Sequence, residues 1–422
     1  MRSHKSFFLI TICLFLSLNS YRLKAQEQIS AAEVETKSLQ LYQDKNWGDL
    51  IDFVKKALDE KNDYFYLRMR IGIAYYELKN YTKAEPQFKK ALSFNSTDAV
   101  AQEYLYYSYL FNRKSDDAKA LSANFSDELS KKTGTNKKSS INMIFFESGT
   151  KISDSANYYN KIKHDRSIFF KPAMYIQAGL SHGIGKKNSL LHAITYFNQQ
   201  SNSSTITQFQ YYLSASFPLK NNWYFSPSIH WINLSSKNQF ITIHPNPPFP
   251  PIVKTQTTNN VNDYFVGSFD LQKRIVNVTL SVGTTISTIN NTTQIINSGM
   301  LSLAPLGNSH VIFGCNAYLH TINSYKTINN SFSPFVYLEP LNGLSIKASY
   351  LANNNDNIIE MNGYLVNNST DLTTSRWSVL VNGTINKHFS IYGLYQAEQK
   401  LETVQLSNYK YAVLVAGFKM MF

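Results

Sequence analysis

The stretch that decides the fold is Val276–Ile286, with the sequence VNVTLSVGTTI. Every second residue is apolar or threonine, and the residues between them are small or polar. A period of two predicts a β-strand with one apolar and one polar face, because successive side chains of a strand point to opposite sides. The same alternation recurs in residues 207–217 and 311–320. We therefore expect the chain after residue 140 to be a series of amphipathic strands.

The connections between these strands alternate in length. Long polar gaps, such as Ser235–Asn260 and Leu351–Thr374, alternate with short turns. The short turns are expected at Gly183–Lys187, Pro218–Asn222, Gln272–Arg274, Pro305–Asn308, Glu339–Gly343 and Ile385–Lys387. An even number of strands of about ten residues, joined in this way, is typical of a bacterial outer-membrane barrel, and we expect about 14 strands. A soluble β-sandwich is the less favoured alternative, because it gives no reason for the alternation.

The chain closes on one more alternating segment, from Ala412 to Phe422, which ends in an aromatic residue. This ending resembles the C-terminal insertion signal of outer-membrane barrels. The resemblance implies two partners, the barrel assembly machinery and the lipid of the outer membrane.

The N-terminus has the composition of a secretory signal. Residues 1–5 are basic, residues 7–18 are apolar, and Ala25 offers a cleavage point, so residues 1–25 are expected to be removed. An uncleaved anchor is the alternative. Beyond this segment no run of 18 or more apolar residues exists, which excludes a helical membrane protein. Of the two cysteines, Cys13 lies in the signal, so Cys315 has no disulfide partner in the mature chain.

Residues 31–132 change to a helical period and repeat at a spacing of 34, since Trp47 aligns with Tyr81 and Val54 with Phe88. The best copy resembles the tetratricopeptide repeat through Gly72, Tyr75, Tyr81, Ala84, Phe88 and Ala91. A polar segment without periodicity follows and reads as a linker. We therefore expect a signal peptide at 1–25, a tetratricopeptide-like helical domain at 26–129, a linker at 130–140 and a barrel at 141–422.

The resemblance to tetratricopeptide repeats also implies a partner groove. In that family the first helix of each repeat lines the concave face at its second, fifth, ninth, twelfth and thirteenth positions. These positions correspond to Tyr66, Met69, Ile73, Tyr76 and Glu77 in the best copy, and the weaker copies add Tyr42, Tyr107 and Phe111. Because aromatic side chains dominate the energetics of interfaces, we expect a protein partner. The alternative is that the rim of the barrel or the degenerate third repeat covers this surface.

Charged and polar residues on the inward faces of the strands are expected to line the lumen, because a Lys or Arg facing lipid at the midplane costs about 2–4 kcal/mol. The expected lumen residues are Gln208, Gln210, Asp270, Asn277, Thr279, Ser281, Lys347, Arg376 and Glu398. Pairing across the Ile385–Lys387 turn predicts that Arg376 lies opposite Gln396 and diagonal to Glu398, as an exposed charged pair near the outer rim.

The sequence contains no catalytic or metal-binding motif that we recognise. There is no Gly-x-Ser-x-Gly, no His-Glu-x-x-His and no phosphate-binding glycine loop. His310 and His320 are ten residues apart on one strand, about 33 Å by strand rise, so they are not expected to share a metal. No cofactor is expected. The net charge of +13 is compatible with anionic solutes, and a secreted barrel argues against nucleic acid.

The order of domains resembles tetratricopeptide-barrel proteins of the outer membrane, which include exopolysaccharide exporters and the YaiO-like barrels. This resemblance implies a channel or export pore that is not an enzyme, with its N-terminal domain in the periplasm. Two alternatives stay open. One is a structural subunit with a filled barrel that anchors a periplasmic complex, and the other is a lipid-modifying barrel enzyme with a Ser/His pair near one membrane interface.

Overall fold

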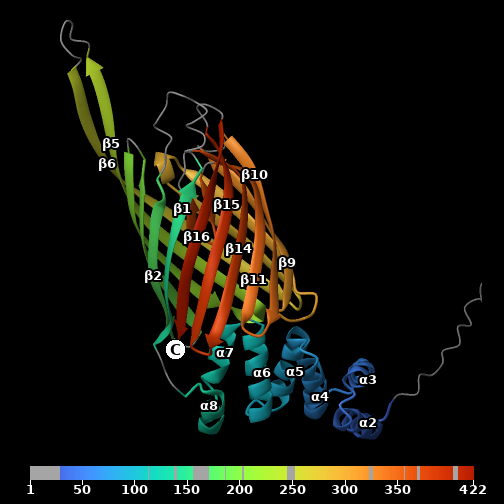
Figure 1. Ribbon diagram of the computed structural model, residues 1–422. Coiled ribbons are helices and arrows are strands. Elements are labelled where there is room, and N and C mark those ends of the chain that lie inside the picture. The colour runs from blue at the N-terminus through green and yellow to red at the C-terminus, as the bar shows by residue number, and fades with distance from the viewer. Residues whose placement is uncertain are drawn as a thin grey trace, which may run out of the picture.

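The computed structural model describes residues 29–112, 114–136, 140–154, 171–185, 187–201, 204–244, 252–322, 327–355, 357–367, 371–402 and 407–422. The expected signal peptide, residues 1–25, lies outside these ranges. The described part of the chain forms a helical stack followed by a β-barrel (Figure 1).

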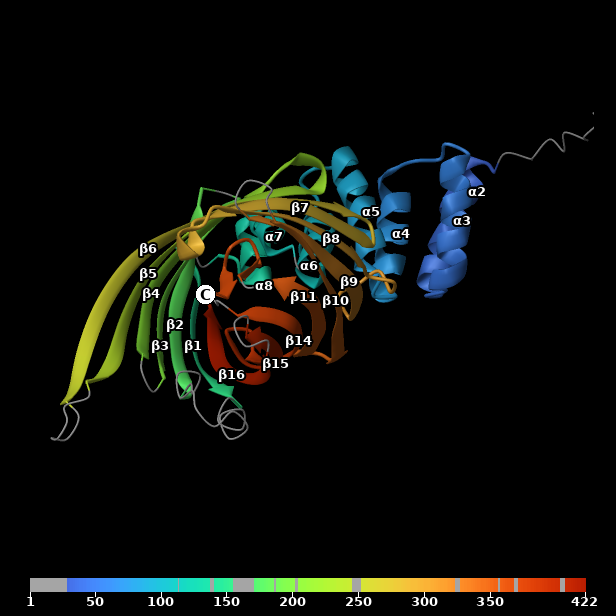
Figure 2. The same cartoon turned by 90° about the horizontal axis from the view of Figure 1, so that it is seen from above.

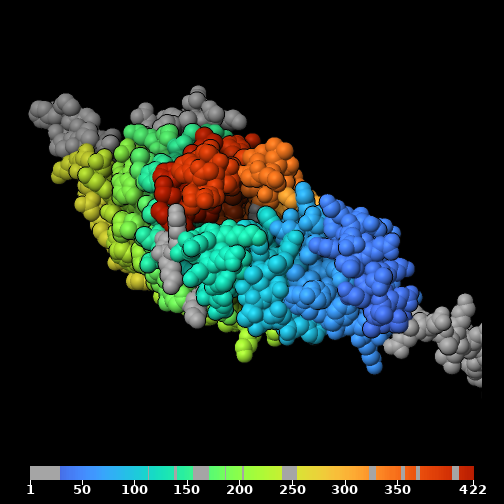
Figure 3. All heavy atoms as spheres, turned by 90° about the horizontal axis from the view of Figure 1, so that it is seen from below, coloured from blue at the N-terminus to red at the C-terminus, as the bar shows by residue number. Residues whose placement is uncertain are grey.

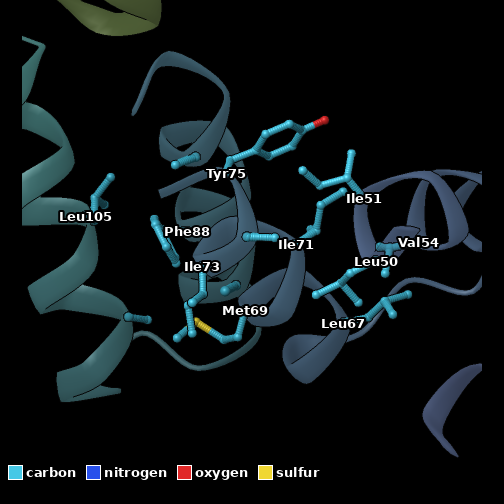
Figure 4. Close-up of a cluster of buried hydrophobic side chains, with 14 of the residues drawn as sticks. Leu50, Ile51, Val54, Leu67, Met69, Ile71, Ile73, Tyr75, Phe88 and Leu105 are labelled. Atoms are coloured by element: carbon cyan, nitrogen blue, oxygen red, sulfur yellow. The ribbon is translucent and has the colours of Figure 1, made fainter. Parts of the chain in front are cut away.

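Seven helices precede the barrel in the described residues, and they form three antiparallel pairs followed by a short last helix. They are α2 (Ala31–Gln43), α3 (Trp47–Asp59), α4 (Phe65–Glu77), α5 (Tyr81–Phe94), α6 (Ala99–Phe111), α7 (Ser115–Ser122) and α8 (Asp127–Thr133). The helices of the best repeat pack closely, because Gly72 leaves room for the Phe88 ring: a Cβ at Gly72 would lie 2.7 Å from Phe88 Cε1. Figure 4 shows Phe88 among the buried aliphatic side chains of this core. No helix in the described ranges is long and apolar enough to cross a membrane.

The expected linker begins inside a helix, because α8 extends to Thr133. Ser126 accepts a hydrogen bond from the Leu129 N–H at 3.2 Å, and Gly134 ends the helix in the left-handed conformation with φ of 72°. These are ordinary start and stop residues of a helix, and acidic residues in the first turn with lysines in the last favour the helix dipole. The expected boundary at residue 130 was therefore wrong, since a single helical turn or two carries too little periodicity to be recognised.

Fourteen strands of the described residues close into one antiparallel barrel in which consecutive strands are neighbours and β1 pairs with β16. The barrel strands are β1 (Ile141–Ser153), β2 (Ala173–Ile184), β3 (Asn188–Gln200), β4 (Ser204–Pro218), β5 (Trp223–His244), β6 (Ile252–Ile275), β7 (Val278–Ser287), β8 (Gln294–Leu303), β9 (Val311–Ile322), β10 (Thr327–Leu341), β11 (Leu344–Asn355), β14 (Leu372–Asn386), β15 (Phe389–Glu402) and β16 (Ser407–Met421). The expected fold class, a helical stack followed by a barrel of about 14 strands, is confirmed.

The outer face of the barrel is apolar, as the alternation predicts. In β7, Leu280, Val282 and Ile286 are 43%, 60% and 52% exposed. Aromatic pairs lie near both ends of this band, with Phe217 against Phe225 at one end and Phe209 against Trp231 at the other. Eight residues of strand at about 3.3 Å per residue, tilted by about 40°, separate the two levels by about 20 Å, which suits the apolar band of an outer-membrane barrel.

Two turns lie later in the chain than expected. β6 continues to Ile275, and the turn is Val276–Asn277, with Val276 at φ of 46°. A β-branched residue rarely adopts this conformation, so a turn at this position was not expected. The next error has the same form: Asn386 pairs with Phe389, so the expected Ile385–Lys387 turn is displaced.

The gap expected between Ser235 and Asn260 is mostly strand. β5 and β6 pair with each other as far as His244 and Ile252, well beyond the other strands (Figure 1). Their polar threonines and asparagines suit a strand with water on both faces, and such a strand has no apolar alternation to reveal it.

Candidate functional site

A short hairpin, β12 (Ile358–Glu360) and β13 (Leu365–Asn367), folds from the β11–β14 connection into the barrel. Its tip is held by the wall of the barrel through backbone carbonyls. The Asn362 carbonyl accepts hydrogen bonds from Ser228 Oγ at 2.6 Å and Tyr212 OH at 3.2 Å. The Gly363 carbonyl accepts one from His230 Nδ1 at 2.8 Å. β4 and β5 therefore hold the tip, which sequence reasoning placed in an outside loop.

The hairpin also contacts walls on other sides. Tyr364 OH donates to Gln177 on β2, and Glu360 forms an ion pair with Arg376 on β14. Ile359 is buried in an apolar cluster with Ile232 and Val266. The hairpin, residues 357–367, thus crosses the lumen and contacts strands on opposite sides of the barrel.

Arg376 belongs to a buried charged network rather than an exposed pair. Arg376 pairs in register with Glu398, so the expected partner Gln396 was wrong by two residues, as the displaced turn requires. Both side chains are buried, at 6% and 5% exposure. Lys151 and Lys400 lie 3.7 and 3.9 Å from the Glu398 carboxylate. The ion pair of Arg376 is with the hairpin, a partner that strand pairing alone could not reveal.

Sequence reasoning missed a second polar cluster in the lumen. Glu147 on β1 accepts hydrogen bonds from Tyr175 and Tyr392 on the neighbouring side of the barrel. Lys419 lies 4.9 Å from the centre of the Tyr392 ring. The inward parity of Glu147 on its strand was the available signal, because a carboxylate facing lipid is costly.

The other expected lumen residues divide into two groups. Gln210 donates to Gln208 at 2.8 Å and contacts His230, and Ser281 donates to Asp270, so these side chains share the inward face. Lys347 lies 4.7 Å from the centre of the Phe335 ring, and Thr279 shares the parity of Ser281 on β7. Asn277 was wrongly expected to line the lumen: it lies in the β6–β7 turn and accepts a hydrogen bond from Thr82 of the helical stack at 2.6 Å.

The structure places the expected groove residues at different depths. Tyr66 and Phe111 are 62% and 43% exposed, Glu77 is exposed, and Tyr42, Tyr76 and Tyr107 are half-buried. Met69 and Ile73 are buried at 7% and 8% exposure, so they were wrongly expected on the surface. The reason is that α4 packs against both α5 and α6, and Figure 4 shows these two side chains in the core between the helices.

Aromatic rings gather at one end of this surface. The Tyr76 ring lies 4.9 Å from Tyr104 and 5.2 Å from Tyr81, and Tyr81 stacks on Phe111 at 4.6 Å. Burial among these rings raises the pKa of Tyr76. The cluster is therefore packed and pre-formed, and Tyr66 lies outside it as a free anchor.

The helical stack lies at the end of the barrel that carries the short turns (Figure 1). Asn308 donates to the Lys79 carbonyl at 3.0 Å, and Ser309 donates to the Phe111 carbonyl at 3.1 Å. On the other side, Lys119 donates to Asn142 at the start of β1 at 2.8 Å. Seen from above, α6, α7 and α8 are visible through the ring of strands (Figure 2). Seen from below, the stack leaves β14, β15 and β16 uncovered (Figure 3).

A buried ion pair lies where the stack meets the barrel. Lys114 Nζ lies 2.8 Å from Glu85 Oε2, and both side chains are less than a tenth exposed. Burial would raise the pKa of Glu85, but the ammonium groups of Lys114 and Lys89 outweigh it and hold this pKa below its usual value. Burial raises the pKa of Asp116, which accepts a hydrogen bond from Ser216 of β4 at 3.1 Å. The contact between the stack and the barrel therefore contains buried ionisable side chains.

In the described ranges, no group of three or more His, Cys, Asp or Glu side chains could hold a metal ion. On the outer face, His182 Nε2 lies 3.1 Å from His192 Nε2, and His192 Nδ1 lies 2.8 Å from Tyr211 OH. These histidines contact each other and a tyrosine, rather than the serine that a lipid-modifying enzyme was expected to need.

No protein-family model matches the chain, and no curated protein matches it either. Among solved structures, a Pseudomonas aeruginosa FadL homologue is 10% identical, covering 72% of this chain and 92% of that one, with a TM-score of 0.42. The CymD monoaromatic hydrocarbon channel is 8% identical, covering 68% and 90%, with a TM-score of 0.38. The structure described as MamA MSR-1 C2 is 19% identical over 26% of this chain, with a TM-score of 0.23, and the match spans 62% of its length.

A closed antiparallel barrel with an apolar outer face pairs the backbone groups of its strands with one another across the apolar band, which is what a lipid bilayer requires of strands. With an even strand count and aromatic residues at both ends of the apolar band, the chain is an outer-membrane β-barrel that carries an N-terminal tetratricopeptide-like stack.

Proposed function

We propose that this protein is a non-enzymatic channel of the bacterial outer membrane for small polar solutes, constricted by the hairpin of residues 357–367. The observation that carries the proposal is that the hairpin crosses the lumen between Arg376 and Tyr212. The wall around it is polar, with paired charges of both signs. Such a wall favours hydrated solutes over hydrocarbons, because the polar groups of a hydrated solute keep hydrogen-bond partners during passage.

The proposed topology follows from the position of the helical stack. Removal of residues 1–25 would leave residues 26–129 in the periplasm, and the short turns that contact the stack would then face the same compartment. The long β5–β6 hairpin lies at the opposite end of the barrel and would be outside the cell.

Conductance in planar bilayers tests the channel. The wild-type barrel should give small discrete steps, and a variant in which residues 357–367 are replaced by a short Gly-Ser connection should give larger ones. A matched control leaves the hairpin intact and replaces Glu339→Gln at the periplasmic end of β10, and it should conduct like the wild type. Silence of the wild type under all voltages would count against a channel.

A second candidate is a structural subunit that anchors a periplasmic complex through a filled barrel. Two observations favour it. The hairpin is held by strands on several sides of the barrel, and the helical stack is docked across the rim. The same experiment separates the two: a silent wild type whose hairpin-shortened variant conducts would support the filled barrel.

We further propose that the helical stack docks a periplasmic or outer-membrane protein through its exposed aromatic side chains. Tyr66 is the best anchor, because it is 62% exposed and its ring contacts the neighbouring Phe65 ring. Tyr66→Ala should remove the partner that purifies with the wild-type protein. Val100→Ala, at an apolar residue that is 51% exposed on α6, is the control and should retain it. An unchanged partner set in Tyr66→Ala would return this surface to a purely structural role.

A further inference from the structure

Two histidines meet on the outer face of the barrel. His182 of β2 has the parity of Leu180, and His192 of β3 has the parity of Ile194, and both of these aliphatic residues are exposed on the apolar face. In the β2–β3 register, His192 lies opposite Leu180, two residues from His182, so the two histidines are diagonal neighbours. The ring centroids are 5.2 Å apart and the ring planes differ by 13°. The hairpin therefore forms a histidine pair that no spacing along one strand reveals.

Packing alone does not explain this pair. Polar side chains that face lipid cost free energy and are rare, and an aliphatic residue would fill either position without that cost. The pair lies close to the end of the barrel that carries the short turns. His182 is two residues before Ile184, the last residue of β2, which is about 7 Å by strand rise. At this level the water and headgroups of the membrane interface are within reach of the imidazoles.

The ring nitrogens of the pair have the separation of two metal ligands. His182 Nε2 lies 3.1 Å from His192 Nε2. Two imidazole nitrogens at this separation, each about 2.0–2.1 Å from one ion, subtend an angle of about 95–100° at the ion. This angle lies between the right angle of octahedral or square-planar coordination and the tetrahedral angle. The two nitrogens are therefore placed as adjacent ligands of a single ion.

The other nitrogen of each ring has an oxygen partner. His182 Nδ1 lies 3.4 Å from the Gly183 carbonyl oxygen, and His192 Nδ1 lies 2.8 Å from Tyr211 OH on β4. A carbonyl only accepts, so His182 donates through Nδ1–H and its Nε2 carries a lone pair. The Tyr211 hydroxyl can donate or accept, so when it accepts from His192 the second Nε2 carries a lone pair too. Histidines that bind metals are usually oriented in this way by a partner of the outer nitrogen.

We propose that His182 and His192 chelate a divalent transition-metal ion on the outer face of the barrel. Water fills the remaining positions, because no third His, Cys, Asp or Glu completes a cluster here in the described residues. Imidazole nitrogens with oxygen ligands suit Cu²⁺, Ni²⁺ and Zn²⁺, and Cu²⁺ binds tightest in the usual order of affinities. The ion links β2 to β3 only in the folded barrel, so it stabilises the fold by mass action. The site is separate from the proposed channel.

The test uses the full-length protein without a histidine tag, in detergent, stripped with EDTA and titrated with Cu²⁺. Absorption and electron paramagnetic resonance report nitrogen ligation. The wild type should bind Cu²⁺ saturably, and His182→Gln and His192→Gln should each bind at least about tenfold more weakly. Tyr211→Phe should keep the resonance signal of two nitrogen ligands with a weaker affinity. His310→Gln, at a half-buried histidine ahead of β9, is the control and should bind like the wild type.

Heat-modifiable migration on gels confirms that each variant keeps its barrel. Cu²⁺ should raise the temperature of this shift in the wild type and in His310→Gln, and leave it unchanged in the two histidine variants of the pair. No saturable binding to the wild type overturns the proposal. Equal affinity of the wild type and either variant of the pair overturns it as well, because the ion would then need only one of the two histidines. A silent channel leaves this test unaffected, because the site faces away from the lumen.

Discussion

Thr82 Oγ1 donates a hydrogen bond to Asn277 Oδ1 at 2.6 Å, although the two residues are 195 positions apart. The bond joins the start of α5 to the β6–β7 turn. The Thr82 N–H adds a second bond to the Gly307 carbonyl at 3.0 Å, in the β8–β9 turn. One residue of the helical stack thus contacts two turns of the barrel, and these turns form part of the surface on which the stack is docked.

We predict that cysteines at positions 82 and 277, in a Cys315→Ser background, are joined by a short bis-methanethiosulfonate reagent in intact outer membranes, because each thiolate displaces one sulfinate. The side chains touch, so the stack need not move for the reaction. The band shift on a denaturing gel reports the product. Cysteines at 36 and 277 are the control, since Thr36 lies on the exposed face of α2. Equal yields from both pairs would mean that the stack is not held on the rim.

Orientation in the membrane is tested by labelling. A single cysteine at Thr255, exposed on the long β5–β6 hairpin, should react with an impermeant maleimide on intact cells. One at Lys387, exposed in the β14–β15 turn, should react only after permeabilisation. The reverse pattern would invert the proposed topology.

Removing the charge that holds the hairpin should open the lumen. In Arg376→Gln the buried Glu360 carboxylate loses its ion pair, and breaking one side of a buried pair costs about 3–5 kcal/mol. We expect larger conductance steps and a lower temperature for the gel shift that marks barrel unfolding. Gln396→Ala, which alters the neighbouring inward position opposite Ser378, is the control. An unchanged conductance would separate the hairpin from gating.

Acid should loosen the contact between α2 and α4. Arg70 Nη2 lies 2.5 Å from Glu35 Oε1, and this hydrogen bond holds the pKa of Glu35 below its usual value. The stabilisation is therefore present above the unfolded carboxylate pKa of about 4.3 and is lost as the pH falls through the lower folded pKa.

The matched variant for this window is Arg70→Gln. It should destabilise the stack at neutral pH by about 1 kcal/mol, a modest figure because the Glu35 side chain is 44% exposed. Below pH 4 the melting curves of the variant and the wild type, followed by helical circular dichroism, should converge. A constant difference at all pH values would mean that the Glu35 charge is not involved.

Periodicity was sufficient to predict the two domains and the barrel. The alternation from Val278 to Ile286 predicts a whole strand, and the alignment of Trp47 with Tyr81 predicts a whole helical repeat. Each prediction therefore holds even where the position of a single turn is wrong. Turn positions were not predictable to within two residues, because Val276 adopts a left-handed conformation that nothing in its neighbours demands. That small displacement moved Asn277 from the lumen to the rim.

The inward hairpin was beyond reach for a different reason. The segment from Asn357 to Asn367 is short, and its position is fixed by side chains of β2, β4, β5 and β14 that are distant in sequence. The only available signal was the pair of charged residues, Arg376 and Glu398, on the inward faces of neighbouring strands. Both are buried in the structure, which shows that other groups fill the lumen beside them.

The contacts between the helical stack and the barrel have a mechanical consequence. Its contacts run from Asn142 at the start of β1 to Ser309 ahead of β9, so the stack restrains the strands of this arc of the barrel. We therefore expect widening of the cross-section to concentrate in the remaining arc, which is formed by β10, β11 and β14 to β16. That arc contains Arg376, so the strand that holds the hairpin is also one of those left free to flex.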